Sequence, residues 1–455
     1  MFNFQEIIAI TPTGALGWGK AGEKSFEEGL KRNPHFIAAD AGSWDSGPYY
    51  VGKELEHSPR EWIQHDVEMM LLAARERNIP LIIGGAGGNG TRGQLEGTVE
   101  MVKKIASENN IKFRMGIIDA QLEKEYLKKK LNEGKIEGLG FERDLTWQDV
   151  ERSSIITAQM GVEPIIKALD EGAEVIIAGR SCDDALFAAI PIKEGFDPGL
   201  ALHMGKILEC AALSAVPESV KETMIGSIRK DHFLVEPAEQ KMRCTVESIA
   251  AHSLYERANP FIQAGPGGVN DFRDCKFEQY SERIVKVTGS KFIKDDLYKV
   301  KLEGVAWIGY RTVGLLGLRD PIMIEKIDDI LNDWKELIKE NYSNYGKDYR
   351  INFHLYGKNA VMGALEPEYN STPHELALVT EVLGKTQELS SSICKFFQHG
   401  LLFYPYEGQK TTAGNIAHLY SVETWDVEEA YEISVDHLLV LNNPCECFKI
   451  NIVNI

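Results

Sequence analysis

The sequence predicts an α/β protein in which an N-terminal, doubly wound and mostly parallel sheet is followed by a C-terminal α+β domain. Up to about residue 225, short runs rich in Ile and Val alternate with longer helical patterns. These runs show little polar alternation, which is typical of strands buried on both faces of a parallel sheet. Beyond about residue 230, longer runs alternate apolar and polar side chains, which indicates strands with one solvated face. Since 455 residues suit two or three domains, we expect domains at 1–225 and 226–455.

Six short apolar runs are the expected strands of the N-terminal sheet. They cover residues 7–11, 35–40, 81–85, 112–119, 154–158 and 174–179. Helical patterns cover residues 22–32, 61–77, 93–108, 120–132 and 161–171 between them, and residues 199–214 after them. The second of these helices has the clearest start, because Ser58 can cap it, Pro59 suits its first position and Glu61 completes a capping box. This alternation of strands and helices favours a doubly wound sheet.

The C-terminal domain combines β-rich runs with two expected helices, at 322–339 and 373–395. Its last segment reads as two strands joined by the turn Asn442-Asn443-Pro444. Glycine within a β-type run marks a bulge or a close approach of the backbone to a ligand. Candidate ligand contacts beside such glycines are Asn270, Asp271, Tyr310 and Arg311.

The composition excludes several classes of protein. The formal net charge is −18 and no cluster of Lys and Arg stands out, so we expect no nucleic-acid partner. We find neither a basic leader before a long apolar core nor a run of about 18 apolar residues, so we expect neither secretion nor membrane spanning. The seven cysteines are dispersed and form no C-x-x-C pair, which fits reduced thiols in the cytoplasm.

Polar residues gather where the expected strands end. In an open parallel sheet, ligands bind outside the carboxyl ends of the strands. If all six strands are parallel, the loops that follow them share one rim, which glycines, hydroxyl groups, Asp and Arg would crowd. Tight turns alone could explain any one loop, but their concurrence favours a ligand site. The loops cover residues 11–19, 40–50, 84–94, 119–121, 159–161 and 179–187.

The third loop contains Gly85-x-Gly87-x-x-Gly90, the spacing of a dinucleotide-binding turn. NAD is nevertheless less favoured, because that turn usually opens a sheet and its partner acid follows about 20 residues later. Here Asp119 lies 29 residues past Gly90. Arg92, just after the turn, favours an anionic ligand such as a carboxylate or a coenzyme A ester at the start of the next helix. A purely structural turn remains an alternative.

Acidic residues follow two other strands. Asp40 and Asp45 can bind a metal or act as acid and base, or they can form Asx turns. In the loop after the sixth strand, Arg180 can grip a carboxylate. Asp183 and Asp184 can face the rim there or cap the next helix.

The helix at 199–214 carries His203, Lys206, Glu209 and Cys210 on neighbouring turns of one side. This polar stripe, in a helix of otherwise small and apolar residues, either faces a ligand site or forms a partly buried, salt-bridged face.

Six segments, in order and spanning nearly the whole chain, resemble the acyclic terpene utilisation protein A family. They are FIAADAGSWDSGPYY, IIGGAGGNG, IIAGRSCDDALF, HMGKILECAAL, KVKLEGVAWIGYRTVGLLGLRDP and AYEISVDHLLVLNNP. The resemblance implies catabolism that proceeds through branched acyl-CoA esters, and a separate small companion subunit. The resemblance assigns no catalytic residue to this sequence. The sequence departs from the family pattern at Ser181-Cys182-Asp183-Asp184, which leaves open which of the two acids faces the rim.

We therefore expect a cytoplasmic catabolic enzyme of the lyase or hydratase type, whose substrate is a small branched or unsaturated carboxylic acid or its CoA thioester. Its site would lie at the strand ends, in the cleft between the domains. No cofactor is certain: a divalent metal is a candidate, and CoA would enter as part of the substrate. The candidate catalytic residues are Asp40, Asp119, Asp183 and Asp184. The candidate substrate-binding residues are Thr13, Gly14, Ser43, Gly85, Gly87, Gly88, Asn89, Arg92, Arg180, Ser181, His203 and Glu209.

Two rival functions remain open: a non-catalytic binding or scaffold subunit that needs a small partner, and a nucleotide-dependent ligase or transferase. The absence of a GxxxxGK[ST] motif weighs against a P-loop enzyme. We further expect a homo-oligomer.

Overall fold

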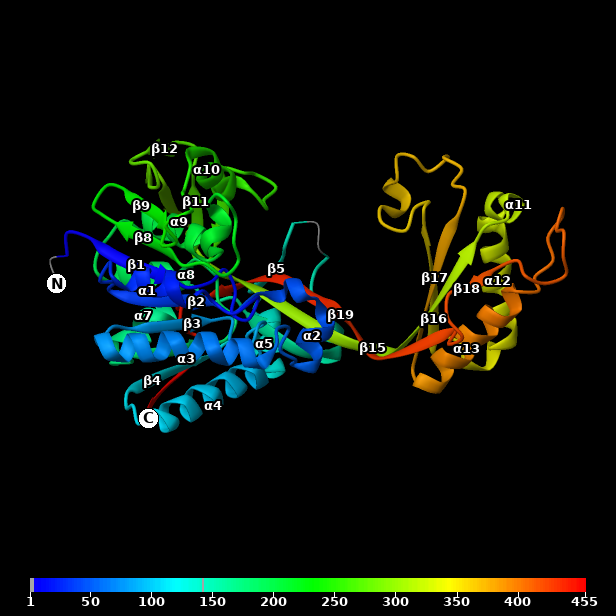
Figure 1. Ribbon diagram of the computed structural model, residues 1–455. Coiled ribbons are helices and arrows are strands. Elements are labelled where there is room, and N and C mark those ends of the chain that lie inside the picture. The colour runs from blue at the N-terminus through cyan, green and yellow to red at the C-terminus, as the bar shows by residue number, and fades with distance from the viewer. Residues whose placement is uncertain (1–3, 141–142) are drawn as a thin grey trace. The chain divides into compact units, whose positions relative to one another are not determined.

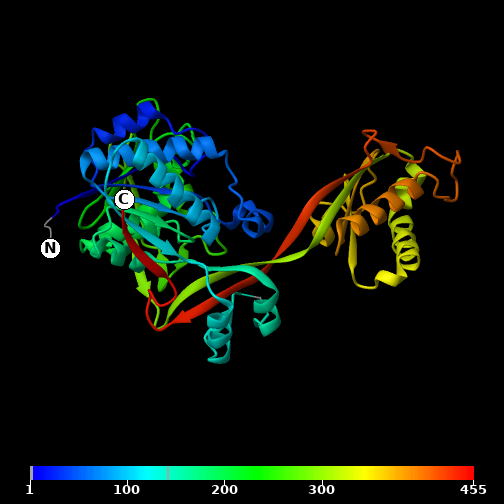
Figure 2. The same ribbon diagram turned by 90° about the horizontal axis from the view of Figure 1, so that it is seen from below.

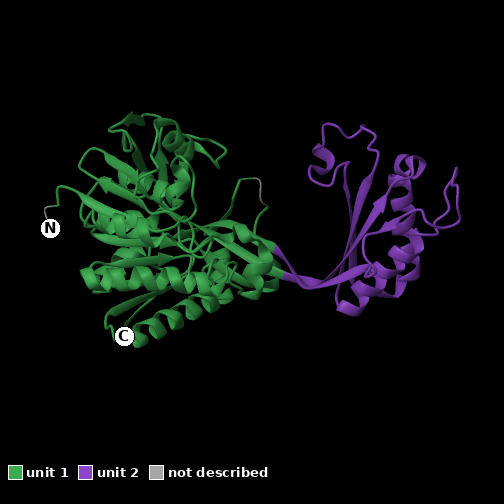
Figure 3. Ribbon diagram, viewed as in Figure 1, with its two compact units in different colours: residues 1–306, 433–455 green, residues 307–432 purple. Residues whose placement is uncertain are grey.

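The computed structural model describes residues 4–140 and 143–455. The chain divides into two compact units (Figure 3): the first comprises residues 1–306 and 433–455, and the second comprises residues 307–432. These bounds differ from the expected domains at 1–225 and 226–455, because residues 226–306 and the last 23 residues, 433–455, pack with the first unit.

The first unit is built on a ten-stranded sheet with the strand order β12-β13-β9-β8-β1-β2-β3-β7-β4-β20. Its five central strands are parallel: β1 (Ile7–Thr11), β2 (Phe36–Asp40), β3 (Leu81–Gly84), β7 (Val175–Ala178) and β4 (Arg114–Asp119). They confirm five of the six expected strands, and with them the α/β fold class. Antiparallel strands extend both edges: β8 (Met224–Ile228), β9 (Phe233–Pro237), β13 (Val285–Thr288) and β12 (Lys276–Gln279) on one side, and β20 (Lys449–Asn454) on the other.

Helices cover both faces of this sheet, so it is doubly wound (Figure 1). Successive residues of β1 point to opposite faces: Ile7 and Ala9 pack in one core, and Ile8 and Ile10 in the other. The first core includes α7 (Val162–Asp170), α8 (Ala185–Lys193) and α9 (Pro198–Leu208). The second includes α1 (Glu23–Leu30), α3 (Arg60–Arg77) and α4 (Arg92–Glu108).

The expected strand at 154–158 forms as β6 (Ser153–Ala158), but it is not part of the ten-stranded sheet. It pairs antiparallel with β15 (Tyr298–Leu318), with Ala158 opposite Leu302. The expectation that all six strands share one parallel sheet is therefore wrong. A strand buried in either sheet presents the same apolar run, so the pattern could not distinguish the two positions.

The expected capping box at Ser58 does not form. Pro59 occupies the N-cap position of α3 and no side chain caps that helix. The capping box forms at α4 instead, where Thr91 and Gln94 satisfy each other's backbone N–H groups.

The last two strands lie in different sheets. β19 (Thr424–Leu441) belongs to the seven-stranded sheet that contains β15, whereas β20 lies along β4 at the edge of the ten-stranded sheet (Figure 2). The turn at Asn442, Asn443 and Pro444 therefore leads the chain from one sheet to the other.

The second unit packs helices against antiparallel strands. In it β17 (Leu376–Gly384) pairs with β16 (Tyr349–Tyr356) and with the C-terminal part of β15. Three helices share a core with them: α11 (Pro321–Glu325), α12 (Ile327–Asn341) and α13 (Gln387–Leu401). The expected helix at 373–395 is wrong over 376–384, where LALVTEVLG forms β17 and alternate residues from Leu376 are buried.

Smaller elements complete the described chain. The helices are α2 (Pro48–Lys53), α5 (Lys124–Asn132), α6 (Trp147–Arg152) and α10 (Val246–Leu254). The strands are β5 (Ile136–Gly138), β10 (Ile262–Gly265), β11 (Gly268–Asp271), β14 (Lys291–Lys294) and β18 (Ala417–His418). Among the residues that the structure describes, no helix combines the length and apolar character needed to cross a membrane.

Candidate active site

A cavity of about 290 Å³ opens at the carboxyl ends of the parallel strands, within the first unit. The loops after β1, β2, β3 and β7 all contribute to it, together with the end of α9 and the residues after α10. This arrangement matches the expected rim for four of the six loops. The residues that line it include Gly14, Leu16, Trp18, Asp40, Ser43, Asp45, His57, Ile63, Gly87, Gly88, Asp183, Glu209, Cys210, Tyr255 and Glu256.

The glycine-rich loop after β3 packs directly against the loop after β2. Gly85 has a φ of +61°, and a Cβ there would lie 2.4 Å from the carbonyl oxygen of Gly42. Asn89 joins the same loops, because its Nδ2 donates to Ser43 O at 2.6 Å and to Ser46 Oγ at 2.7 Å. Glycine is thus required for loop contact, while Gly87 and Gly88 line the cavity.

The start of α4 is engaged within the protein rather than open to an anion. Gln94 Oε1 accepts from the backbone N–H groups of Asn89 and Thr91. Gln121 Oε1 accepts from the N–H of Arg92 at 3.0 Å, and Glu54 Oε1 accepts from the N–H of Gly93 at 2.8 Å. A phosphate or carboxylate would have to displace these acceptors, so the structure does not support the anion site expected at this turn.

Arg92 and Asp119 bind each other and do not line the cavity. Arg92 Nε donates to Asp119 Oδ2 at 2.8 Å, and its Nη2 donates to Glu123 Oε1 at 3.0 Å. The two residues that the sequence offered as anion holder and proton-transfer group thus form an ion pair at the end of β4.

Asp40 is one of two deeply buried acids of the cavity. It is 7% exposed, and its Oδ1 has no hydrogen-bond partner. Burial raises the pKa of Asp40 well above its usual value, and the charges of Asp183 and Glu209 raise it further. The backbone of Gly42 and the charge of Arg180 oppose this rise without outweighing it. Asp40 therefore keeps its proton to a higher pH than an exposed aspartate does.

Glu209 is the second buried acid. Burial raises the pKa of Glu209 to about 8, against the lowering effect of Lys206, whose Nζ donates to its carboxylate. Its neighbour Cys210 has a thiol pKa raised to about 12, first by burial and then by the charge of Glu209. Cys210 is therefore a neutral thiol at physiological pH, and it lies 3.5 Å from the Tyr255 hydroxyl.

The raised pKa of Glu209 makes stability depend on pH. Between its usual value of 4.5 and about 8, the folded protein keeps a proton that the unfolded chain releases, so stability falls as pH rises. We expect Glu209→Gln to flatten this fall, since glutamine does not titrate. Denaturant unfolding at pH values below and above this window measures the slope. Equal slopes in the variant and the wild type would contradict the assignment.

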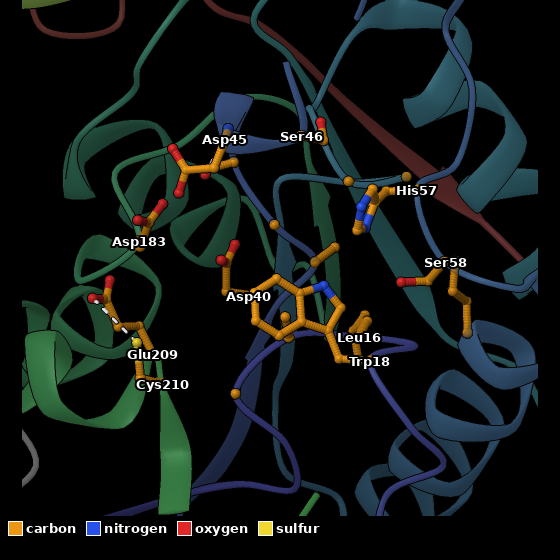
Figure 4. A pocket seen from close by; sticks show the side chains of 18 of the residues that line it. Leu16, Trp18, Asp40, Asp45, Ser46, His57, Ser58, Asp183, Glu209 and Cys210 are labelled. Carbon is orange, nitrogen blue, oxygen red and sulfur yellow. Dashed lines mark hydrogen bonds between the residues drawn. The ribbon is translucent and has the colours of Figure 1, made fainter. Parts of the chain in front are cut away.

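Acidic and apolar side chains share the cavity. Figure 4 shows Asp183, Glu209 and Cys210 on one side, His57 and Ser58 on the other, and Asp40, Leu16 and Trp18 between them. Among the described residues that line the cavity, none is Lys or Arg. Acids that face one another in this way cannot all ionise without mutual repulsion.

Arg180 supports the cavity without lining it. This buried side chain donates from Nε to Glu303 Oε2 at 2.7 Å and from Nη1 to Asp183 Oδ1 at 3.2 Å. It thereby ties the loop after β7 to β15 and holds Asp183 in position. Its neighbour Ser181 is also buried and has an unpartnered Oγ.

Two other candidates hold the surrounding structure. Thr13 Oγ1 donates to Val220 O at 2.8 Å and fixes the loop after β1, which places Gly14 in the lining. His203 is fully buried between Ser253 and Ser290, 2.8 and 2.7 Å from its ring nitrogens, and stacks on Phe272. Burial lowers the pKa of His203 to about 3, so the ring is neutral. The polar stripe of α9 is thus divided: Glu209 and Cys210 face the cavity, and His203 does not.

Asp183 and Asp184 face different cavities. Asp183 lines the one described above, whereas Asp184 lines a second. Asp184 occupies the N-cap position of α8 but makes no capping hydrogen bond. Asp183 is therefore the acid that faces the cavity at the strand ends. Asp184 does not cap α8 through its side chain.

The candidates from residues 226–455 lie outside the cavity. Asp271 is paired with Arg273, and Arg311 with Glu381. Asn270 lines the second cavity, and Tyr310 lines neither. Among the described residues, no group of three or more His, Cys, Asp or Glu is arranged to hold a metal ion.

The sequence pattern did not single out several lining residues. Trp18 lies in the expected rim loop 11–19 but was not a candidate itself, and His57 lies in a loop without a motif. Tyr255 and Glu256 follow α10, far along the chain from the parallel strands. Long-range contacts of Tyr255 with Cys210 and of Glu256 with Lys206 bring them to the site. A helix end that approaches a distant loop leaves no periodic signal, so no local pattern predicts Tyr255 or Glu256.

Comparison with known protein families shows which family this chain belongs to. Residues 53–415 match the model of the Acyclic terpene utilisation family protein AtuA, which covers most of the chain. The protein belongs to the acyclic terpene utilisation family. The AtuA match includes Asp183, Glu209 and Tyr255, while Asp40 precedes it. No curated protein and no solved structure matches the chain. Membership of the AtuA family supports a role in acyclic terpene utilisation.

Proposed function

We propose that this protein is a cytoplasmic lyase or hydratase that transfers protons to and from a small branched or unsaturated acyl group, presented as its CoA thioester. The observation that carries the proposal is the pair of buried carboxyl groups, Asp40 and Glu209, whose pKa values are raised in one cavity. Enzymes that transfer protons near neutral pH need acids tuned in this direction.

The two buried acids Asp40 and Glu209 can share a proton between them. Because their charges repel, a proton held by one favours the ionised form of the other, and the charge of Asp183 raises the pKa of both. Such a cluster supplies a general acid and a general base at the same pH.

Such a cluster can add water to a conjugated acyl thioester without a net gain or loss of protons. One carboxylate takes a proton from water, and the hydroxyl oxygen bonds to the β-carbon as the C=C π bond opens. A protonated carboxyl gives its proton to the α-carbon. One proton is taken and one is given, so the cluster returns to its starting state, and the reverse sequence removes water.

The charge of the lining favours a thioester over the free acid. A free carboxylate would lie beside Asp183 and would oppose the ionisation of Asp40 or Glu209 that the chemistry needs, with no facing Lys or Arg among the described lining residues. A thioester carbonyl is neutral and avoids this repulsion. The cavity volume of about 290 Å³ is near the lower end of the range for ligand pockets. It suits the acyl group of the thioester, with the nucleotide part of CoA outside the cavity. Leu16, Trp18 and Ile63 supply apolar contact for a branched chain.

The test compares two forms of one substrate. We expect the wild-type protein to hydrate a branched 2-enoyl-CoA thioester, followed by loss of the ultraviolet absorbance of the conjugated thioester. The free acid with the same carbon skeleton should not turn over. Turnover of the free acid alone, or of neither form, would overturn the proposal.

The family resemblance also supports a separate small companion subunit, and we propose a homo-oligomeric assembly. Adding a co-expressed small partner to the same assay distinguishes a scaffold from an enzyme. Activity that appears only with the partner would favour the scaffold function.

A further inference from the structure

A second cavity, of about 300 Å³, lies within the first unit on the other side of the loop after β7. One wall is the three-stranded sheet β10-β11-β14, and the facing wall comes from the starts of α7 and α8 and from α9. Its apolar lining consists of Val162, Ala185, Ile192, Pro198, Leu202, Pro266, Phe292 and Pro444.

Three buried acceptor oxygens in this lining have no hydrogen-bond partner: Asp184 Oδ1, Gln263 Oε1 and Asn270 Oδ1. Asp184 is 5% exposed and Asn270 is 2% exposed. The Cys182 thiol is a weak hydrogen-bond donor to the Asp184 carboxyl and lowers its pKa, against the larger rise caused by burial. A buried acceptor without a partner is costly, and three in one cavity call for a donor from outside the protein.

The orientation of both amide groups is fixed by their own hydrogen bonds. Gln263 Nε2 donates to Asp184 Oδ2 at 2.8 Å, and Asn270 Nδ2 donates to Gly199 O at 3.0 Å. Only the NH2 side of an amide can make these bonds, so the oxygen side is left unpaired.

The three oxygens belong to one cluster. Gln263 lies directly opposite Asn270 in the β10–β11 pair, so both side chains share a face of the sheet. Phe292 lies opposite Asn270 on the next strand and lines the same cavity. Since Gln263 is bonded to Asp184, the carboxylate completes the acceptor cluster.

We propose that this second cavity binds a primary alkylammonium ion. An R–NH3⁺ group offers three donors for the three acceptors, and its positive charge complements the carboxylate of Asp184. The apolar lining takes the alkyl body. Glu163 and Lys294 also line the cavity, and their opposite charges interact with each other, so Asp184 supplies the carboxylate that this pair leaves unbalanced. The site is independent of the proposed acid–base chemistry, because its test measures binding and not turnover.

The experiment compares isopentylammonium with isopentyl alcohol by isothermal titration calorimetry on the full-length protein. The alcohol has the same carbon skeleton but one donor and no charge. We expect the ammonium ion to bind and the alcohol to bind at least about tenfold more weakly, because hydrogen bonds to charged groups are the stronger ones. Equal affinity, or no binding of the ammonium ion, would overturn the proposal. Calcium binding that competes with the amine would instead identify a metal site.

Three variants sharpen the test. Asp184→Asn keeps the shape and removes the charge, and should weaken ammonium binding about tenfold or more. Asp183→Asn removes a charge one residue earlier, in the first cavity, and should leave ammonium binding intact or modestly tighter, since the Asp183 charge disfavours ionisation of Asp184.

Gly265→Val blocks the cavity without depending on Asp184. A Cβ at Gly265 would find only Cys182 Sγ nearby, at 4.0 Å, so a side chain fits at the end of β10 and fills the space. We expect this variant to lose ammonium binding while it keeps the thioester activity of the first cavity. Wild-type binding in Gly265→Val or in Asp184→Asn would place the amine elsewhere and overturn the proposal.

Discussion

Replacing Asp40 by asparagine should lower turnover of the branched enoyl thioester by roughly 10²–10⁴-fold, the contribution typical of a positioned acid or base. Asparagine keeps the size of the side chain but can neither take nor give the proton. Asp40 is buried, its Oδ1 has no partner, and it interacts with Asp183 and Glu209. Steady-state kinetics measure the loss, and we expect it in kcat more than in KM.

Asp119→Asn is the matched comparison for Asp40→Asn. Asp119 also ends a parallel strand, but its carboxylate is bound to Arg92 outside the cavity. We expect its loss to affect turnover far less than the loss of Asp40. A larger effect at Asp119 than at Asp40 would place the chemistry at the end of β4 and refute the assignment of the cavity.

Replacing Arg180 by methionine should lower the free energy of unfolding by about 3–5 kcal/mol, the usual cost of breaking a buried ion pair. Arg180 and Glu303 are both buried and lie 2.7 Å apart. Removing the guanidinium leaves the Glu303 carboxylate with only Lys301, at 3.2 Å. Denaturant unfolding measures the loss.

The double variant Arg180→Met/Glu303→Gln tests the cause of this loss. Without the buried carboxylate there is no uncompensated charge, so much of the lost stability should return. A double variant as unstable as the sum of the two single variants would show that packing of Arg180, and not its charge, supports the loop after β7.

The central sheet could be predicted from the sequence because its strands carry an unambiguous signal. Runs such as IIAIT and LIIG are too short and too apolar for anything but strands buried on both faces. β6 carries the same signal, SSIITA, yet pairs with β15. Sheet membership depends on partners distant in sequence, which no local pattern encodes.

The sequence predicted which loops meet more accurately than it predicted the partners of their charged residues. Asp40, Ser43, Gly87, Gly88 and Asp183, all expected at the rim, line one cavity. The expected anion holders did not face it, because Arg92 and Arg180 already have carboxylate partners, at Asp119 and Glu303. An arginine in a loop shows its charge in the sequence but not which acid neutralises it.

The most direct test of the central claim, that the acid-lined cavity transfers protons to an acyl chain, is the thioester hydration assay run in D2O. Asp40 and its neighbours exchange their protons with solvent, so they would deliver deuterium to the α-carbon. We predict one deuterium at that carbon in the hydrated product, detected by mass spectrometry and NMR, and none delivered by Asp40→Asn beyond its residual turnover. Product that carries only protium at the α-carbon, or deuterium incorporation by Asp40→Asn at the wild-type rate, would contradict the account.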